Sequence, residues 1–470
     1  MTDSERGIDL TAPVERAARL LSRSGLDFFD VYASYSRSMR ITIMGKGIKD
    51  TGSSVDVGLG VRAYKNKGLG TAYSQSLNPL DVEETANRAI AYARVAQPDP
   101  FFREIPGPSK APDVGGLFDE KVAGLNMEEV GEFAKEMIGA VGDVRPGAMH
   151  DGGVSAGCTR SFFVASTGVS VKDERTVLSA SIAATYKQGQ DTGSSSEFEY
   201  GMSLPEVDFA KVGRRAAEKA VEQFGSRKVE SATLPLVIVP EPASSMFFGL
   251  MAAISGEQVV KGRTFASNLL GNQIGPEWLG IHDDGTLPGA VGSATYDGEG
   301  VPTRRMSVVD HGSLKAFLHN SYSAGIAGVE TNGHAQRGGY GVYVGAGPAN
   351  VVVKPGDSSL DEMIAETKRG ILVSGADFAP SMVTGEFSST IDEGFLIENG
   401  EKKNSVKNLM AGGHILDLYR SMDMISREGR TFGKGHFFPS VRISAVRLSG
   451  YQSLNALQYC PRAPSRLVES

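Results

Sequence analysis

The chain has 470 residues, enough for two or three domains with large hydrophobic cores. Its formal net charge of −7 favours solubility and argues against general nucleic-acid binding, which prefers a basic surface. The two cysteines, Cys158 and Cys460, are too few for a disulfide framework or a thiolate metal cage. Because the polar N-terminus has no signal-peptide pattern and the apolar run at 246–254 is too short to span a bilayer, we expect a soluble cytoplasmic protein.

The first half of the chain repeats one pattern of helix, strands and helix. Apolar residues at helical spacing alternate with strand blocks of period-two polarity, and glycine turns separate the strands. Strands that are grouped between helices favour an α+β fold over a doubly wound α/β sheet. The expected helices are at 9–24, after a cap at Asn78 or Asp81, at 126–141 and at 204–225, and the strand blocks lie at about 30–76 and 161–188.

The second half, from about Lys228, changes to short strands and glycine turns. A buried strand at 234–239 leads into the apolar run, for which we expect a largely buried helix at 244–255. We therefore predict an α+β N-terminal domain at 1–228 and a β-rich C-terminal domain at 229–470. Hairpins are expected at 308–317 and 395–401, and a short helix near 358–367.

Metal and phosphate motifs are weak in this sequence. No two of the seven histidines have the i, i+4 spacing of a helical zinc site. The acidic stretches at 282–286 and 297–300 have the composition of ordinary turns and lack the graded ligand positions of a calcium loop. The glycine-rich stretch at 338–347 leads into a strand rather than a helix N-terminus, so it is not a P-loop.

Four basic residues on short connections are the best candidates for substrate binding. Guanidinium groups on such connections can hold a peptide carboxylate through paired hydrogen bonds. The alternative is that these side chains are solvated or form salt bridges within the protein. The candidates are Arg304, Arg305, His334 and Arg337.

Three blocks of sequence carry a resemblance to a known family. They span 234–265, with the run SSMFFGLMAAISGE, then 297–339, with GVPTRRMSVVDHG, and 383–413, with TGEFSSTIDEGFLIENGE. Their order and spacing resemble the TldD/PmbA family, also called modulators of DNA gyrase. The resemblance implies a cytosolic metallopeptidase family that acts on small unfolded or ribosomally made peptides.

The family has two branches, and the resemblance places this chain in the branch without zinc. TldD-type chains hold zinc with a His-Glu-x-x-x-His motif and a later cysteine, whereas PmbA-type chains, also called TldE, lack these ligands and pair with a TldD-type chain. In this sequence the motif positions fall at Phe248, Gly249 and Ala253, and the cysteine position falls near Phe432. None of these four side chains offers nitrogen, oxygen or thiolate to a metal.

The resemblance therefore implies a non-catalytic subunit of a heterodimeric metallopeptidase, with zinc only in the TldD-type partner. No cofactor is expected in this chain, and isolated chains could form a homodimer. One alternative is a self-sufficient peptidase or other hydrolase that uses the cluster His282–Asp284. Another alternative is a gyrase-modulating factor, which would bind protein rather than DNA because of the acidic charge.

Overall fold

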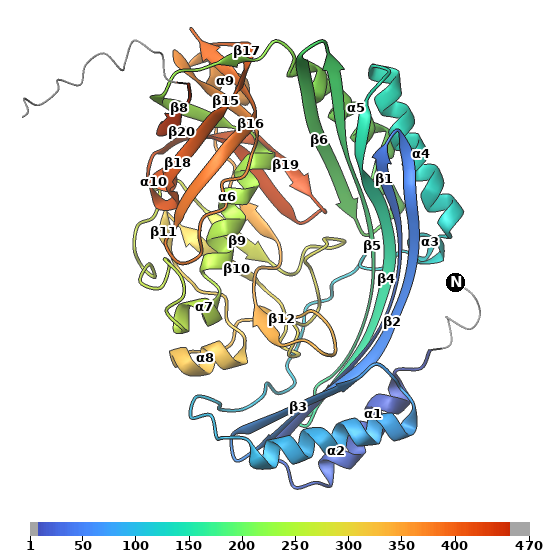
Figure 1. The fold of residues 1–470 in the computed structure, drawn as a ribbon. Helices are drawn as coiled ribbons and strands as arrows, with labels where there is room; N and C mark the ends of the chain where they lie inside the picture. Colours follow the sequence, from blue (N-terminus) through green and yellow to red (C-terminus); the bar gives the residue numbers. More distant parts are fainter. Residues whose placement is uncertain (1–7, 452–470) are drawn as a thin grey trace, which may run out of the picture.

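A computed structural model describes residues 8–451, and in it a long curved sheet from the first half of the chain runs along one side of a compact second half (Figure 1). The predicted α+β class is confirmed, because the first half contains only antiparallel strand pairs and the second half is rich in strands. None of the helices between residues 8 and 451 combines the length and apolar character that crossing a membrane requires. Cys158 is buried, and Cys460 lies outside the described residues.

The first sheet joins two antiparallel hairpin blocks of the chain. Its strand order is β3-β2-β1-β4-β5-β6, so the blocks meet where β1 pairs with β4, from Asp30 opposite Ala165 to Gly45 opposite His150. Side chains alternate along β1, and apolar residues such as Val31 face the helices while serines face the second half. The strands are β1 (Phe28–Gly45), β2 (Gly47–Lys65), β3 (Gly68–Ser74), β4 (Met149–Ala165), β5 (Ser170–Gln188) and β6 (Asp191–Gly201).

The helices of the first half cover the face of this sheet that points away from the second half (Figure 1). Asn78 caps α2, as predicted, by accepting a hydrogen bond from the backbone of Leu80. Asn126 and Glu129 form a capping box at the start of α4, which satisfies two backbone donors at once. The helices are α1 (Thr11–Ser22), α2 (Pro79–Val95), α3 (Glu120–Gly124), α4 (Met127–Val144) and α5 (Phe209–Glu222), with a 3₁₀ turn at Leu204–Glu206.

The second half is built around a mixed sheet whose strand path is β11-β10-β9-β14-β20-β8-β15-β16-β17-β7, with β18 and β19 attached to it. The buried strand predicted at 234–239 is β8, which lies between β20 and β15. The strands are β7 (Arg227–Lys228), β8 (Ala232–Ile238), β9 (Ile281–Asp284), β10 (Arg305–Asp310), β11 (Ser313–Leu314), β14 (Val351–Val353), β15 (Arg369–Ala376), β16 (Glu386–Glu398), β17 (Glu401–Lys407), β18 (Leu409–His414), β19 (Met422–Phe432) and β20 (His436–Ser449). A separate pair joins β12 (Ala335–Arg337) and β13 (Val344–Ala346).

Both predicted hairpins of the second half are present. Asp310 pairs with Ser313 through a turn at His311 and Gly312, whose φ angles are both positive, as a tight hairpin turn requires. Asn399 and Gly400 make the same kind of turn between β16 and β17. The helices of this half are α6 (Pro240–Ala253), α7 (Gly256–Val260), α8 (Ser321–Ala327), α9 (Leu360–Ala365) and α10 (Ile415–Arg420).

Helix α6 is the helix predicted from the apolar run, and it packs against β20 by contact between apolar and aromatic side chains. Phe247 is fully buried, and its ring stacks on Phe438 at a centroid distance of 5.8 Å. Phe248, the next residue, is only partly buried because it lies on the edge of the same helix face. The core therefore depends on Phe247 more than on Phe248.

We expect Phe247→Ala to lower the free energy of unfolding by about 3–5 kcal/mol, because it leaves a cavity in a closed core. Phe248→Ala is the matched control on the same helix, and its loss should be smaller because the ring is partly exposed. Urea denaturation followed by far-UV circular dichroism measures both values. Equal losses for the two variants would contradict the packing described here.

Candidate functional site

The positions that the family resemblance assigns to zinc ligands are occupied by aromatic packing. The Phe248 ring stands edge-on to His436 at 4.9 Å and to Phe438 at 5.1 Å between ring centroids. The Phe432 ring lies 6.0 Å from the same Phe438 ring. Rings therefore gather around Phe438 at the positions that the resemblance assigns to zinc ligands.

The two small residues at these positions leave no room for larger ones. A Cβ atom added at Gly249 would lie far inside van der Waals contact with the Pro380 ring. Ala253 is fully buried in the core. Since neither position can take a glutamate or histidine without rearrangement, the residues present do not fit a zinc ion.

His436 lies among these rings and is a potential metal ligand, but its hydrogen bonding opposes metal binding. Its Nδ1 accepts a hydrogen bond from the backbone N–H of Val351 at 3.0 Å, which places the ring hydrogen on Nε2. Burial lowers the pKa of His436 to about 4, although the Asp283 carboxylate acts in the opposite direction. Between residues 8 and 451, no three histidine, cysteine, aspartate or glutamate side chains are grouped to hold a metal ion.

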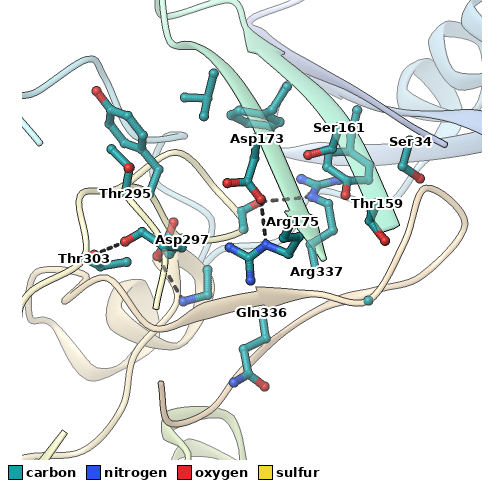
Figure 2. A pocket seen from close by; sticks show the side chains of 18 of the residues that line it. Ser34, Thr159, Ser161, Asp173, Arg175, Thr295, Asp297, Thr303, Gln336 and Arg337 are labelled. Carbon is teal, nitrogen blue, oxygen red and sulfur yellow. Dashed lines mark hydrogen bonds and ion pairs between the residues drawn. The ribbon is translucent and has the colours of Figure 1, made fainter. Parts of the chain in front are cut away.

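A cavity of about 710 Å³ lies between the first sheet and the loops of the second half (Figure 2). Its floor consists of side chains from β1, β4 and β5 that point away from the helices. Its opposite wall comes from the loops near 292–298 and 333–339, which are rich in glycine and alanine. The labelled floor residues of Figure 2 are Ser34, Thr159, Ser161, Asp173 and Arg175.

His334 lies on the cavity wall, but both of its ring nitrogens are engaged within the protein. Nε2 is 2.8 Å from the Asp283 carboxylate, and Nδ1 is 2.9 Å from Oδ1 of Asn332. The orientation of the Asn332 amide follows from its bonds to the backbones of Phe317 and His319. Both ring nitrogens therefore have partners within the protein, and the contact with Asp283 holds the loop against β9.

Arg337 also lines the cavity and belongs to a buried ionic cluster between the two halves. Its Nη2 is 3.3 Å from Asp30, whose carboxylate also binds Arg62 at 2.7 Å. Arg62 in turn lies 3.2 Å from Glu299. The Arg337 guanidinium is packed over the ring of Tyr32 at 5.2 Å, so it is shielded as well as paired.

The other two predicted binding residues lie apart from this cavity. Arg304 and Arg305 are exposed. Arg305 begins β10, where its backbone lies opposite that of Asp284 on β9. The structure thus brings His334 and Arg337 together and leaves Arg304 and Arg305 outside the group. No observation assigns a ligand to any of the four.

The acidic residues near the cavity have structural partners within the protein. Asp297 accepts hydrogen bonds from the backbones of Glu299, Val301 and Ala335, while burial and the nearby Glu299 raise its pKa to about 7. Within the cluster 282–284, His282 and Asp283 are neighbours on β9 and so point to opposite faces of the sheet. His282 and Asp283 are therefore not placed to work as a catalytic pair. Asp284 shares a face with His282, but its carboxylate accepts hydrogen bonds from the backbone N–H and the hydroxyl of Thr286.

Sequence reasoning missed the hydroxyl-bearing floor of the cavity. The signal was present as serine at every second position of β1, namely Ser34, Ser36 and Ser38. Period-two serine on a strand marks a solvated face, and only the placement of the second half turns part of that face into a cavity wall.

Comparison with known proteins shows which family the chain belongs to. Models of the PmbA/TldA metallopeptidase family match residues 29–93 as domain 1, 119–224 as the central domain and 231–450 as the C-terminal domain. The metalloprotease PmbA of Escherichia coli O157:H7 is 26% identical over 409 residues, which cover 86% of this chain and 88% of that protein. A metalloprotease of Methanocaldococcus jannaschii is 24% identical over 413 residues, covering 86% of this chain and 90% of its own length.

The fold is shared with a solved structure. TldE from Thermococcus kodakarensis superposes with a TM-score of 0.84 at 23% sequence identity, covering 93% of this chain and all of that one. At this identity the likeness shows the fold alone. The family models divide the first half into two pieces, and the structure joins these pieces in one sheet through β1 and β4.

We expect Gly249→Ala to lower the free energy of unfolding by about 1–3 kcal/mol, because the new methyl group meets Pro380. Gly131→Ala is the matched control, since it lies in helix α4 with open space around it and should raise stability by about 0.5–1 kcal/mol. Urea denaturation measures both. A Gly249→Ala chain as stable as the parent would show that this helix accepts a side chain there.

A pH dependence follows from His436. Its folded-state pKa of about 4 lies below the ordinary histidine value of about 6.5, so the unfolded chain binds the proton more readily. The stabilising contribution is complete above pH 6.5 and is lost as the pH falls toward 4. We expect imidazole resonances of His436 to titrate near pH 4 by NMR. In His436→Gln this component of acid destabilisation should be absent, and an unchanged acid limb would argue against the assignment.

Proposed function

The chain belongs to the PmbA/TldD metallopeptidase family, and from this premise we propose that it is the metal-free subunit of a two-chain peptidase. The observation that carries the proposal is the packing of Phe248 and Phe432 around Phe438, where zinc ligands would be needed. Zinc and the catalytic glutamate then come from a TldD-type partner with a His-Glu-x-x-x-His motif. The likeness to TldE from Thermococcus kodakarensis supports this assignment by fold.

The proposed complex acts in the cytoplasm on small unfolded or modified peptides, and this chain shapes part of the peptide path. The cavity beside the first sheet is the natural place for that role, because it is large and lined by polar groups. His334 and Arg337 stand at its wall, and their internal partners suit them to holding the cavity's shape. In the absence of the partner, the chain is expected to be free of zinc, and isolated chains could form a homodimer.

A self-sufficient hydrolase is less well supported by the described residues. Among the cavity-lining groups, the Asp297 carboxylate is held by backbone N–H groups and His334 is saturated by its neighbours. General acid–base catalysis requires a titrating group within reach of a substrate atom. Burial raises the pKa of Asp297 to about 7, but both of its carboxylate oxygens accept backbone hydrogen bonds, and both ring nitrogens of His334 have partners within the protein.

The proposal is tested by measuring metal content and peptide cleavage. The purified chain alone should contain no stoichiometric zinc and should not cleave a flexible peptide. Addition of a TldD-type partner should produce cleavage that a zinc chelator abolishes, because only the partner can lower the pKa of a zinc-bound water. Elemental analysis and mass spectrometry of the peptide products provide the readouts.

The control for this experiment is a partner whose motif glutamate is replaced by glutamine, which should form the complex without cleaving peptide. Stoichiometric zinc in the lone chain, together with chelator-sensitive cleavage, would refute the subunit assignment. Cleavage by the partner that is unaffected by this chain would likewise show that the two chains do not act together.

A further inference from the structure

A buried carboxyl group with an unpaired oxygen lies where β16 meets the first sheet. Glu393 is only 8% exposed, and its Oε2 atom has no hydrogen-bond partner among residues 8–451. The hydroxyl of Ser195 on β6 is also buried and also lacks a partner within those residues. A buried polar atom left unpaired costs free energy, so two such atoms at one junction require an explanation.

A glycine on the neighbouring strand makes room for the Glu393 side chain. Gly375 on β15 lies opposite Glu393 in register, and a Cβ atom added at Gly375 would lie 2.9 Å from both Cβ and Cγ of Glu393. The carboxyl group itself lies near the hydroxyl of Ser195 and the backbone of Ser196 on β6. Glu393 therefore places a polar group in the junction between the two halves of the chain.

The cations of this junction already have other carboxylates as partners. Lys219 on α5 lies 3.5 Å from the Glu197 carboxylate and donates a hydrogen bond to a backbone carbonyl of β6. Arg430 on β19 binds the same Glu197 at 2.6 Å and also pairs with Glu241. If Glu393 were ionised, three carboxylates would face two cations and leave one negative charge unbalanced. A proton on Glu393 restores the balance.

Burial raises the pKa of Glu393, and the negative charge of the adjacent Asp392 acts in the same direction. The nearby Ser195 hydroxyl, the Ser196 backbone N–H and the Lys219 ammonium group act in the opposite direction. The folded chain therefore binds this proton more readily than the unfolded chain does. The stabilising contribution is then present at acid pH and is lost as the pH rises through the folded-state pKa.

We propose that the junction between β6 and β16 is a pH-sensitive contact, which is closed when Glu393 carries a proton and weakened when that proton is lost. A protonated carboxyl group donates a hydrogen bond, and the Ser195 hydroxyl is the unpaired acceptor beside it. The ionised group is unfavourable while it stays buried, and separation of β16 from β6 relieves this by admitting water. The contact through Arg337 and Asp30 pairs opposite charges, so it holds while this junction opens. The inference does not depend on the proposed function.

The test compares the full chain with its Glu393→Gln variant, whose neutral amide has the shape of the protonated carboxyl group. Amide hydrogen exchange followed by mass spectrometry measures the protection of β6 and β16, with exchange times scaled for the intrinsic effect of pH. In the parent chain, protection of both strands should fall at least about threefold between about pH 5 and about pH 8. In Glu393→Gln it should stay within about 1.5-fold, and β1 around Asp30 should keep its protection in both chains.

Asp392→Asn is the matched control, because it removes a carboxylate from the next residue of the same strand, where the side chain is exposed. The fall in protection should persist in this variant, and urea denaturation establishes that all three chains are folded. Protection that does not change with pH in the parent, or a fall that persists in Glu393→Gln, would overturn the inference. Protection near pH 8 that depends on whether sodium or a bulky quaternary ammonium ion is present would also overturn it, because Glu393 would then bind a metal cation.

Discussion

The buried ionic cluster of Asp30, Arg62, Glu299 and Arg337 is the contact on which the arrangement of the two halves depends. It joins β1 and β2 to the loop before β10 and to β12, and its two positive and two negative charges balance. Glu299 also accepts the backbone N–H of Ser321, so the start of α8 is fixed by the same group. Removing one member of such a cluster leaves an uncompensated buried charge, at a cost of about 3–5 kcal/mol. The cavity lies beside this cluster, with Arg337 on its wall, so the cluster helps to hold the two sides of the cavity in place.

A second contact between the halves lies at Phe432, near which the resemblance puts the family's cysteine ligand. Arg430 binds Glu197 at 2.6 Å and also pairs with Glu241, and its guanidinium lies 4.8 Å from the Phe432 ring. The same Phe432 ring stacks with Phe198 of the first sheet at 5.6 Å. The residue at the position of the family's cysteine ligand is thus part of the joint between sheet and hairpin. In this chain, Phe432 and Arg430 therefore join the hairpin of β19 and β20 to β6 of the first sheet.

Local sequence patterns predicted the helices, strands and turns well, but they did not predict which side chains line the cavity. Caps at Asn78 and Asn126, the hairpin at His311–Gly312 and helix α6 follow from neighbouring residues, so the sequence contained the needed information. The role of Arg337 did not follow from the sequence, because its partner Asp30 is distant in the chain. The free hydroxyls around Ser34 were equally hidden, since identical serines outside the cavity pair with each other. What decides between a solvated face and a cavity wall is the packing of the second half of the chain against it, which periodicity does not encode.

The pairing of β1 with β4 has a consequence for how the chain is made. β1 ends at Gly45 and β4 begins at Met149. The edge of β1 that pairs with β4 therefore has no partner strand until about a hundred further residues have been synthesised. At about 5–20 residues per second this takes roughly 5–20 s, during which a long strand edge on the ribosome is unpaired. Such edges associate readily with other strands. Synthesis therefore passes through an interval in which the nascent first block exposes a strand edge that favours association with other chains.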